Sequence, residues 1–147
     1  MQSRSTADIQ LAIPKILEQV PYLKLLILFG SRARDDSSPD SDWDFAVLYD
    51  EELGSQHGKH RWDSFALWTV LQQVLQVPDT QLDVIDLSSC SDWLKYDIAR
   101  DGKPLYERQP GEFKAFQQRY LKSPVEMKQL SRELRDRIRY KLKEWQV

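Results

Sequence analysis

Two aspartates spaced two residues apart, Asp42 and Asp44, begin an apolar run in this 147-residue chain. On an extended strand, residues two apart lie on one face about 7 Å from each other, so both carboxylates point the same way. Neighbouring carboxylates repel each other unless a cation lies between them, and Mg²⁺ prefers oxygen ligands, including those of phosphates. The pair therefore predicts a magnesium site.

Gly30 and Ser31 precede these aspartates and end another apolar run, over residues 25–29, which is typical of a strand buried on both faces. Glycine permits backbone dihedrals that are closed to other residues and lets the chain approach a ligand. Ser31 is placed to cap a helix that begins near residues 32–34, and a helix start offers N–H groups to an anion. We therefore predict a phosphate-binding corner that faces the same pocket as the aspartates.

The order Gly30-Ser31, ten residues, then Asp42-x-Asp44 resembles the GS-x10-DxD signature of the DNA polymerase beta-like nucleotidyltransferases. The segment GSRARDDSSPDSDWD also resembles that of their small stand-alone members, the minimal nucleotidyltransferase (MNT) antitoxins. The chain departs from that family at Asp35, where a glycine often stands, and at Trp43, where an aliphatic residue often stands. An isolated DxD would favour a solvated hairpin loop, but the corner, the spacing and the flanking strands together favour the site.

A third strand is predicted over residues 81–87, and its alternation places Asp83 and Asp86 on opposite faces. In the family that the chain resembles, a third acid lies on such a strand within an apolar-Asp-apolar-apolar unit. Asp83 matches that unit better than Asp86, which would lie at the end of the strand. The alternative for Asp83 is a solvent-facing acid on an edge strand.

The resemblance implies an α/β fold with a small mixed sheet covered by helices. It assigns catalysis and metal binding to Asp42, Asp44 and Asp83, and nucleotide binding to Gly30, Ser31 and Arg32, with Arg34 as the alternative to Arg32. It further implies Mg²⁺-dependent transfer of AMP from ATP to a tyrosine of a cognate HEPN-type ribonuclease toxin encoded alongside. Two other functions stay open: an antitoxin that only occludes its toxin, and a transferase acting on a small molecule such as an aminoglycoside.

Helices have to position this site. Apolar residues at helical spacing predict one helix over residues 5–20, kinked at Pro14, and another over residues 59–76. A third helix begins at Ser91 and ends at Gly102. We expect a nucleotidyltransferase domain over residues 1–108.

The C-terminal segment, residues 109–147, follows a Pro-Gly linker and shows two amphipathic stripes. From residue 112 onward ten Lys and Arg residues stand against five acids, a net charge of +5, whereas the preceding residues carry −7. We predict a helical extension packed either on the domain itself or on a partner protein. Nucleic acid is a weaker candidate, because no aromatic-basic motif accompanies the cations.

Composition sets the remaining bounds. A hydrophobic fraction of 41% with 30% charged residues suits one globular domain. Without a leader peptide or a long uncharged run we expect a cytoplasmic protein with no membrane partner, and the single Cys90 excludes an internal disulfide framework. Whether the chain forms a homo-oligomer stays open.

Overall fold

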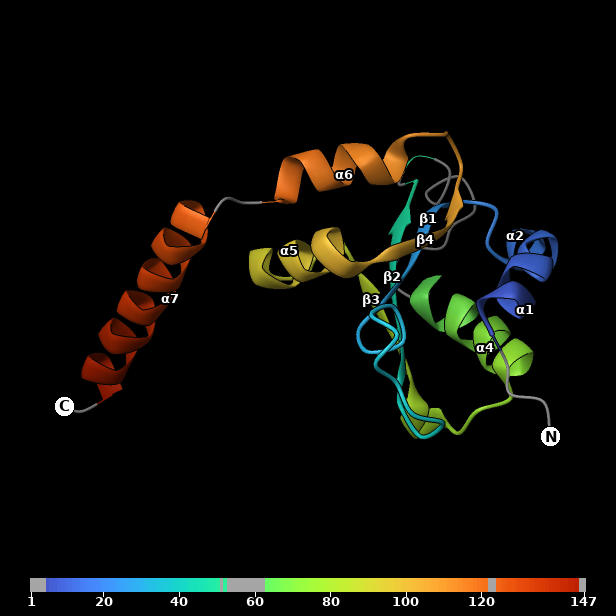
Figure 1. Ribbon diagram of the computed structural model, residues 1–147, viewed down its shortest axis with the longest axis horizontal. Coiled ribbons are helices and arrows are strands. Elements are labelled where there is room, and N and C mark those ends of the chain that lie inside the picture. Colours follow the sequence, from blue (N-terminus) through green and yellow to red (C-terminus); the bar gives the residue numbers. More distant parts are fainter. Residues whose placement is uncertain (1–4, 51, 53–62, 122–123, 146–147) are drawn as a thin grey trace.

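Four strands form the central sheet of the computed structural model, which describes residues 5–50, 52, 63–121 and 124–145 (Figure 1). The strands are β1 (Leu23–Phe29), β2 (Trp43–Tyr49), β3 (Leu82–Asp86) and β4 (Lys103–Glu107), in the spatial order β3-β2-β1-β4. β1 pairs antiparallel with β2 and with β4, and β2 pairs parallel with β3. The predicted mixed sheet is confirmed.

One face of the sheet is covered by α1 (Thr6–Leu11), α2 (Ile13–Gln19) and α4 (Asp63–Leu75). The segment predicted as one kinked helix is two helices that meet at Ala12, and Pro14 lies in the first turn of α2. A proline is tolerated there because its missing N–H has no partner in a helical first turn. Residues 59–62 of the helix predicted over 59–76 lie outside the described residues.

The opposite face is covered by α5 (Asp92–Asp101) and α6 (Glu112–Tyr120), and its core contains residues such as Leu25, Ile27 and Ile98. α6 is fixed to α5 by Gln117, whose Nε2 donates to the Ala99 carbonyl at 2.9 Å. The first helix of the predicted extension therefore packs on the sheet layer. The division at residue 108 stays a prediction.

The last helix, α7 (Pro124–Trp145), extends away from these layers (Figure 1). Among the described α-helices and strands, α7 alone has no extensive contact with another element. A short 3₁₀ helix, η1 (Asp79–Gln81), leads into β3. None of the described helices has the length and apolar character needed to cross a membrane.

Candidate active site

The predicted site residues meet where β1 ends and where β2 and β3 begin. Phe29 pairs with Asp44 across the β1–β2 ladder, and Asp44 pairs with Asp83 across the parallel β2–β3 ladder. Gly30, one residue beyond Phe29, therefore lies beside Asp44. We call the end of the sheet formed by Gly30, Asp42, Asp44 and Asp83 the catalytic edge; it is the lower end of the sheet in Figure 1.

The pleat turns the carboxylates toward one face. Phe45 and Val84, the neighbours of Asp44 and Asp83 in sequence, belong to the core under α1, α2 and α4. Because successive side chains alternate between faces, Asp44 and Asp83 point to the face that α5 and α6 cover. The two carboxylates are thus adjacent on neighbouring strands and lie on the same side of the sheet.

The surroundings of Asp44 disfavour its ionised form. Partial burial raises the pKa of Asp44, the negative charges of Asp83 and Asp42 raise it further, and the charge of Arg34 lowers it. Carboxylates whose charges combine at Asp44 fit a bound cation, which would relieve their repulsion.

The carboxylates do not form a complete metal cage in this conformation. Among the described His, Cys, Asp and Glu side chains, no group of three or more could hold a metal ion by itself. Mg²⁺ is usually bound by only one or two carboxylates and takes water and phosphate oxygens as its other ligands. The pair Asp44 and Asp83, with Asp42 nearby, suits this mode of binding, in which the nucleotide completes the shell.

Gly30 is required by its contact with Asp44. Its φ of +77° lies in the left-handed region, and a Cβ built on it would overlap the Asp44 carboxylate, with the Asp44 Cγ at 3.3 Å. A larger residue would therefore displace the carboxylate as well as strain the backbone. The structure places the predicted glycine corner against the predicted metal ligand.

The helix predicted after Ser31 is wrong. Residues 31–35 form consecutive turns, in which the Ala33 N–H donates to the Gly30 carbonyl at 3.1 Å and the Asp36 N–H to the Ser31 carbonyl at 3.1 Å. Asp35 has a φ of +61°, a left-handed conformation that ends the helical path after a single turn. Glycine adopts this conformation without steric cost, so Asp35 occupies a position suited to that residue.

Arg32 holds the loop that leads to Asp42. Its Nη2 donates to the Ser41 carbonyl at 2.8 Å and to the Pro39 carbonyl at 3.3 Å, and its Nε donates to the Ser41 carbonyl at 3.2 Å. The guanidinium also lies over the Trp43 ring, 4.2 Å from its centroid. The sequence analysis missed this pair, although the tryptophan between the two aspartates was its signal. Nucleotide binding by Arg32 stays a prediction.

Arg34 is the cation whose charge reaches the carboxylates. Its charge lowers the pKa of both Asp44 and Asp101, and its Nε contacts the Asp36 carboxylate at 3.2 Å. Asp36 is well exposed, so this ion pair leaves Arg34 accessible to a competing anion. Of the two arginines considered for the phosphates, Arg34 is better placed.

Asp86 lies away from the catalytic edge and stabilises a turn. It lies at the other end of β3 and accepts hydrogen bonds from the backbone N–H of Ser88 at 2.9 Å and from its hydroxyl at 2.7 Å. Such a contact stabilises the turn that follows the strand. The geometry therefore favours Asp83 over Asp86 as the third acid of the site.

Known proteins are similar to this chain in sequence and in fold. Residues 12–111 match the family described as "Polymerase beta, Nucleotidyltransferase". "Protein adenylyltransferase MntA" of Aphanizomenon flos-aquae is 39% identical over 134 residues, which are 90% of this chain and 89% of that protein. A protein of the same name from Shewanella oneidensis is 31% identical over 97 residues, 66% of this chain and 63% of that protein.

Solved structures add the likeness in fold. One, described as "Crystal structure of the toxin-antitoxin with AMP-PNP", superposes with a TM-score of 0.61 at 24% identity and covers 90% of this chain and 97% of that one. Another, of a "tri-AMPylated Shewanella oneidensis HEPN toxin in complex with MNT antitoxin", gives a TM-score of 0.55 at 24% identity, with 94% and 98% covered. Together with the matched sequence family and the acids at the catalytic edge, these likenesses place the chain in the polymerase beta-like nucleotidyltransferase family, among relatives named protein adenylyltransferase MntA.

Proposed function

We propose that this chain is a Mg²⁺-dependent protein adenylyltransferase and an antitoxin, which transfers AMP from ATP to a tyrosine hydroxyl of a cognate HEPN toxin and so neutralises it. The observation that carries the proposal is the pairing of Asp44 with Asp83 beside Gly30, where any side chain would overlap the Asp44 carboxylate. The relative that is similar over nine-tenths of the chain is named a protein adenylyltransferase. Structures of the same fold are described as complexes with AMP-PNP and with an AMPylated HEPN toxin.

The reaction forms a bond between the tyrosine oxygen and the α-phosphorus of ATP and breaks the bond to the β-phosphate, so that pyrophosphate leaves. Asp42, Asp44 and Asp83 would hold Mg²⁺, which would supply positive charge to offset that of the triphosphate and to favour the ionised acceptor hydroxyl. Asp83, on the neighbouring strand, takes up the hydroxyl proton. The chain thereby aligns the attacking and leaving oxygens, which is the main requirement in such transfers.

Gly30, Ser31 and Arg34 bind the leaving part of the nucleotide. Gly30 allows the backbone to approach the phosphates, and the Ser31 backbone and hydroxyl donate to them. Arg34 offsets their charge, while Arg32 keeps the loop before Asp42 in place. These roles put the phosphate contacts on the first turn after β1 and the metal ligands on β2 and β3.

The direct test incubates the full chain with the HEPN toxin, ATP and Mg²⁺ and measures the intact mass of the toxin. We expect a gain of one or more AMP groups, which an Asp42→Asn/Asp44→Asn variant does not produce. An unchanged toxin mass under conditions where the two proteins bind would refute transfer.

A second function, neutralisation by occlusion alone, draws support from the exposed apolar residues of α7. The same double variant distinguishes the two functions in cells that express the toxin. Protection that survives the loss of both aspartates favours occlusion, whereas lost protection with retained binding favours catalysis.

A further inference from the structure

α7 carries an apolar stripe that no described element covers. Its outer residues are largely exposed, with relative accessibilities of 42% for Leu134, 51% for Ile138, 53% for Leu142 and 83% for Trp145. At 3.6 residues per turn these four side chains lie on one face of the helix, in line with Leu130. Exposure of a continuous apolar stripe is unfavourable in water and is typical of a surface that binds a partner.

The charges of α7 are sorted around this stripe. Arg137 and Lys141 border it on one side and Lys128 and Arg135 on the other, at helical positions about 100° per residue apart. Three of the four acids of α7, Glu126, Glu133 and Glu144, lie on the same side as Arg137, whereas Asp136 lies on the face opposite the stripe. The stripe is therefore apolar along its centre, positively charged along the border of Lys128 and Arg135, and mixed in charge along the other border.

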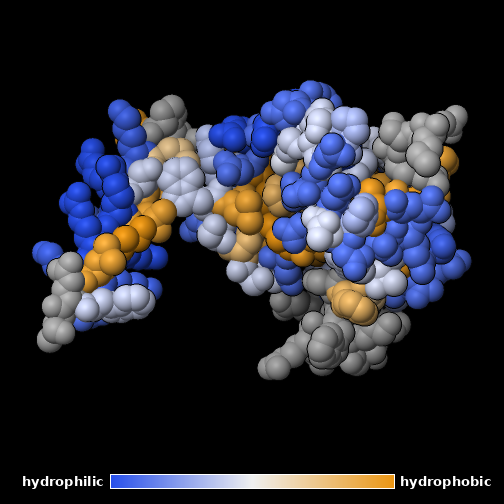
Figure 2. All heavy atoms as spheres, turned by 90° about the horizontal axis from the view of Figure 1, so that it is seen from below, coloured by the Kyte–Doolittle hydropathy of each residue, from blue (hydrophilic) through white to orange (hydrophobic). Residues whose placement is uncertain are grey.

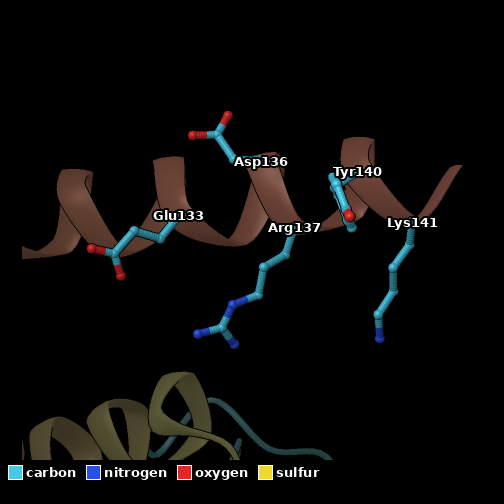
Figure 3. Close-up of a pocket in the computed structure, with 5 residues that line it drawn as sticks. All are labelled: Glu133, Asp136, Arg137, Tyr140 and Lys141. Atoms are coloured by element: carbon cyan, nitrogen blue, oxygen red, sulfur yellow. The ribbon is translucent and has the colours of Figure 1, made fainter. Parts of the chain in front are cut away.

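The stripe also borders a hollow next to the rest of the molecule. Figure 2 shows it as an orange band on α7 beside the gap that separates the helix from the sheet layers. In Figure 3, Arg137 and Lys141 point from α7 toward the side where α5 lies, and Asp136 points away. Near the start of α7, Trp93 of α5 lines a second hollow with Lys128, Arg132 and Arg135.

We propose that α7 is the docking element for the HEPN toxin, and that the toxin offers it an apolar groove with acidic residues along the side that meets Lys128 and Arg135. This inference rests on the proposed function, because it takes the acceptor protein as the occupant. A substrate protein has to reach the catalytic edge, and α7 runs toward the level of that edge in Figure 1. A helix laid into a groove contributes affinity through its apolar residues, and the border charges select an acidic partner.

Charge argues against a second copy of this chain as the occupant. α7 carries seven Lys and Arg residues and four acids, a net charge of +3. Two such helices packed antiparallel, stripe to stripe, would bring their basic borders together, and like charges across an interface are unfavourable. A groove with acidic residues on that side instead turns the basic border into an attractive contact.

The test measures binding of the full chain to the HEPN toxin by calorimetry without ATP, so that it does not depend on transfer. Ile138→Glu/Leu142→Glu places charge in the stripe, and Tyr140→Glu is the matched control, because Tyr140 is 67% exposed on another face of α7. We expect the double variant to lose at least about thirtyfold in affinity, as for the loss of interface anchors. The control should stay within about twofold, since rim positions contribute little.

The other outcomes of this binding experiment overturn the docking proposal in recognisable ways. Unchanged toxin affinity in the double variant would exclude the stripe as the docking surface, and a simultaneous change from dimer to monomer in light scattering would assign it to a second copy. A loss of several degrees in unfolding temperature would assign it to packing within the chain. If the wild-type chain binds through the stripe but transfers no AMP, docking stands and the proposed function fails.

Discussion

At the scale of single residues, the catalytic edge contains a carboxylate, that of Asp44, whose ionised form is disfavoured by its surroundings. Burial and two neighbouring aspartates raise the pKa of Asp44, so the fold binds a proton there more tightly than the unfolded chain does. The contribution of protonated Asp44 to the free energy of unfolding is present at low pH. It is lost as the pH rises through the pKa that Asp44 has in the folded protein. At neutral pH, ionised Asp44 therefore opposes folding unless a cation offsets it.

Asp44→Asn should consequently stabilise the metal-free protein while abolishing its activity. With EDTA at pH 7, we expect a higher unfolding temperature than in the wild type, by about 2–4 °C for each kcal/mol relieved. The gain should shrink near about pH 4, where the wild-type carboxyl is increasingly protonated. Thermal denaturation followed by circular dichroism at several pH values measures this difference.

Transfer of AMP by Asp44→Asn should fall at least about a hundredfold, since a metal contributes several kcal/mol to such a transition state. The control is Asp86→Asn, which removes a charge from the same sheet but at the turn with Ser88. Equal unfolding temperatures for the Asp44 variant and the wild type in EDTA would contradict the assigned repulsion.

Gly30→Ala tests the contact between the glycine corner and the metal ligand. Gly30 and Gly111 both have positive φ, but only at Gly30 would the new Cβ meet another residue, the Asp44 carboxylate. We expect Gly111→Ala to cost about 1–2 kcal/mol through backbone strain alone. Gly30→Ala should cost that amount and in addition lose AMP transfer, measured by denaturant titration and by toxin mass. Full activity in folded Gly30→Ala protein would argue against the packing of Asp44 on this glycine.

At the scale of elements, sequence patterns were most informative where burial sets the pattern. The apolar run over residues 25–29 and the alternation over residues 81–87 predicted β1 and β3, and the Ser91 and Gly102 ends of α5 are confirmed. The opposition of Asp44 and Asp83 also follows from these strands, once their register is known. Register itself was not predictable, because it depends on tertiary pairing.

Short-range turns were predicted poorly. The stretch after Ser31 has residues suited to a helix. It forms a loop instead, because the Arg32 guanidinium donates to the carbonyls of Pro39 and Ser41, seven and nine residues further along. Such contacts between side chain and backbone outweigh a weak helical preference. Trp43 was a signal in the sequence for the stack with Arg32, but the contact itself depends on how the loop folds.

Arg32→Lys tests whether this arginine positions the loop. Lysine keeps the charge but loses the planar fork and the stacking surface. We expect faster hydrogen exchange over residues 38–42 and a kcat lowered between about tenfold and a hundredfold, as for misplaced reacting groups. Arg34→Gln should instead raise the KM for ATP without faster exchange in the loop. If Arg32→Lys changes only the KM for ATP, Arg32 acts as a phosphate ligand.

At the scale of the whole molecule, the chain separates its charges. The sheet layers carry the acidic residues of the catalytic edge, and α7 carries a net charge of +3. An acidic toxin would be attracted by the helix and not by the catalytic edge, so binding and chemistry use different surfaces. The sequence indicated this asymmetry, but it could not show that α6 packs on α5 while α7 stands apart.

Removal of α7 should therefore leave the catalytic unit folded. In a chain that ends at residue 121, the two core clusters keep all their residues, since none of them comes from α7. We expect an unfolding temperature within about 2 °C of the full chain, because about 1 kcal/mol corresponds to a shift of that size or more. AMP transfer to the toxin should fall sharply at micromolar toxin and recover in part at high toxin concentration, because the loss lies in binding. Intact mass spectrometry over a toxin titration distinguishes this from a loss that persists at saturation, which would show that α7 shapes the catalytic edge itself.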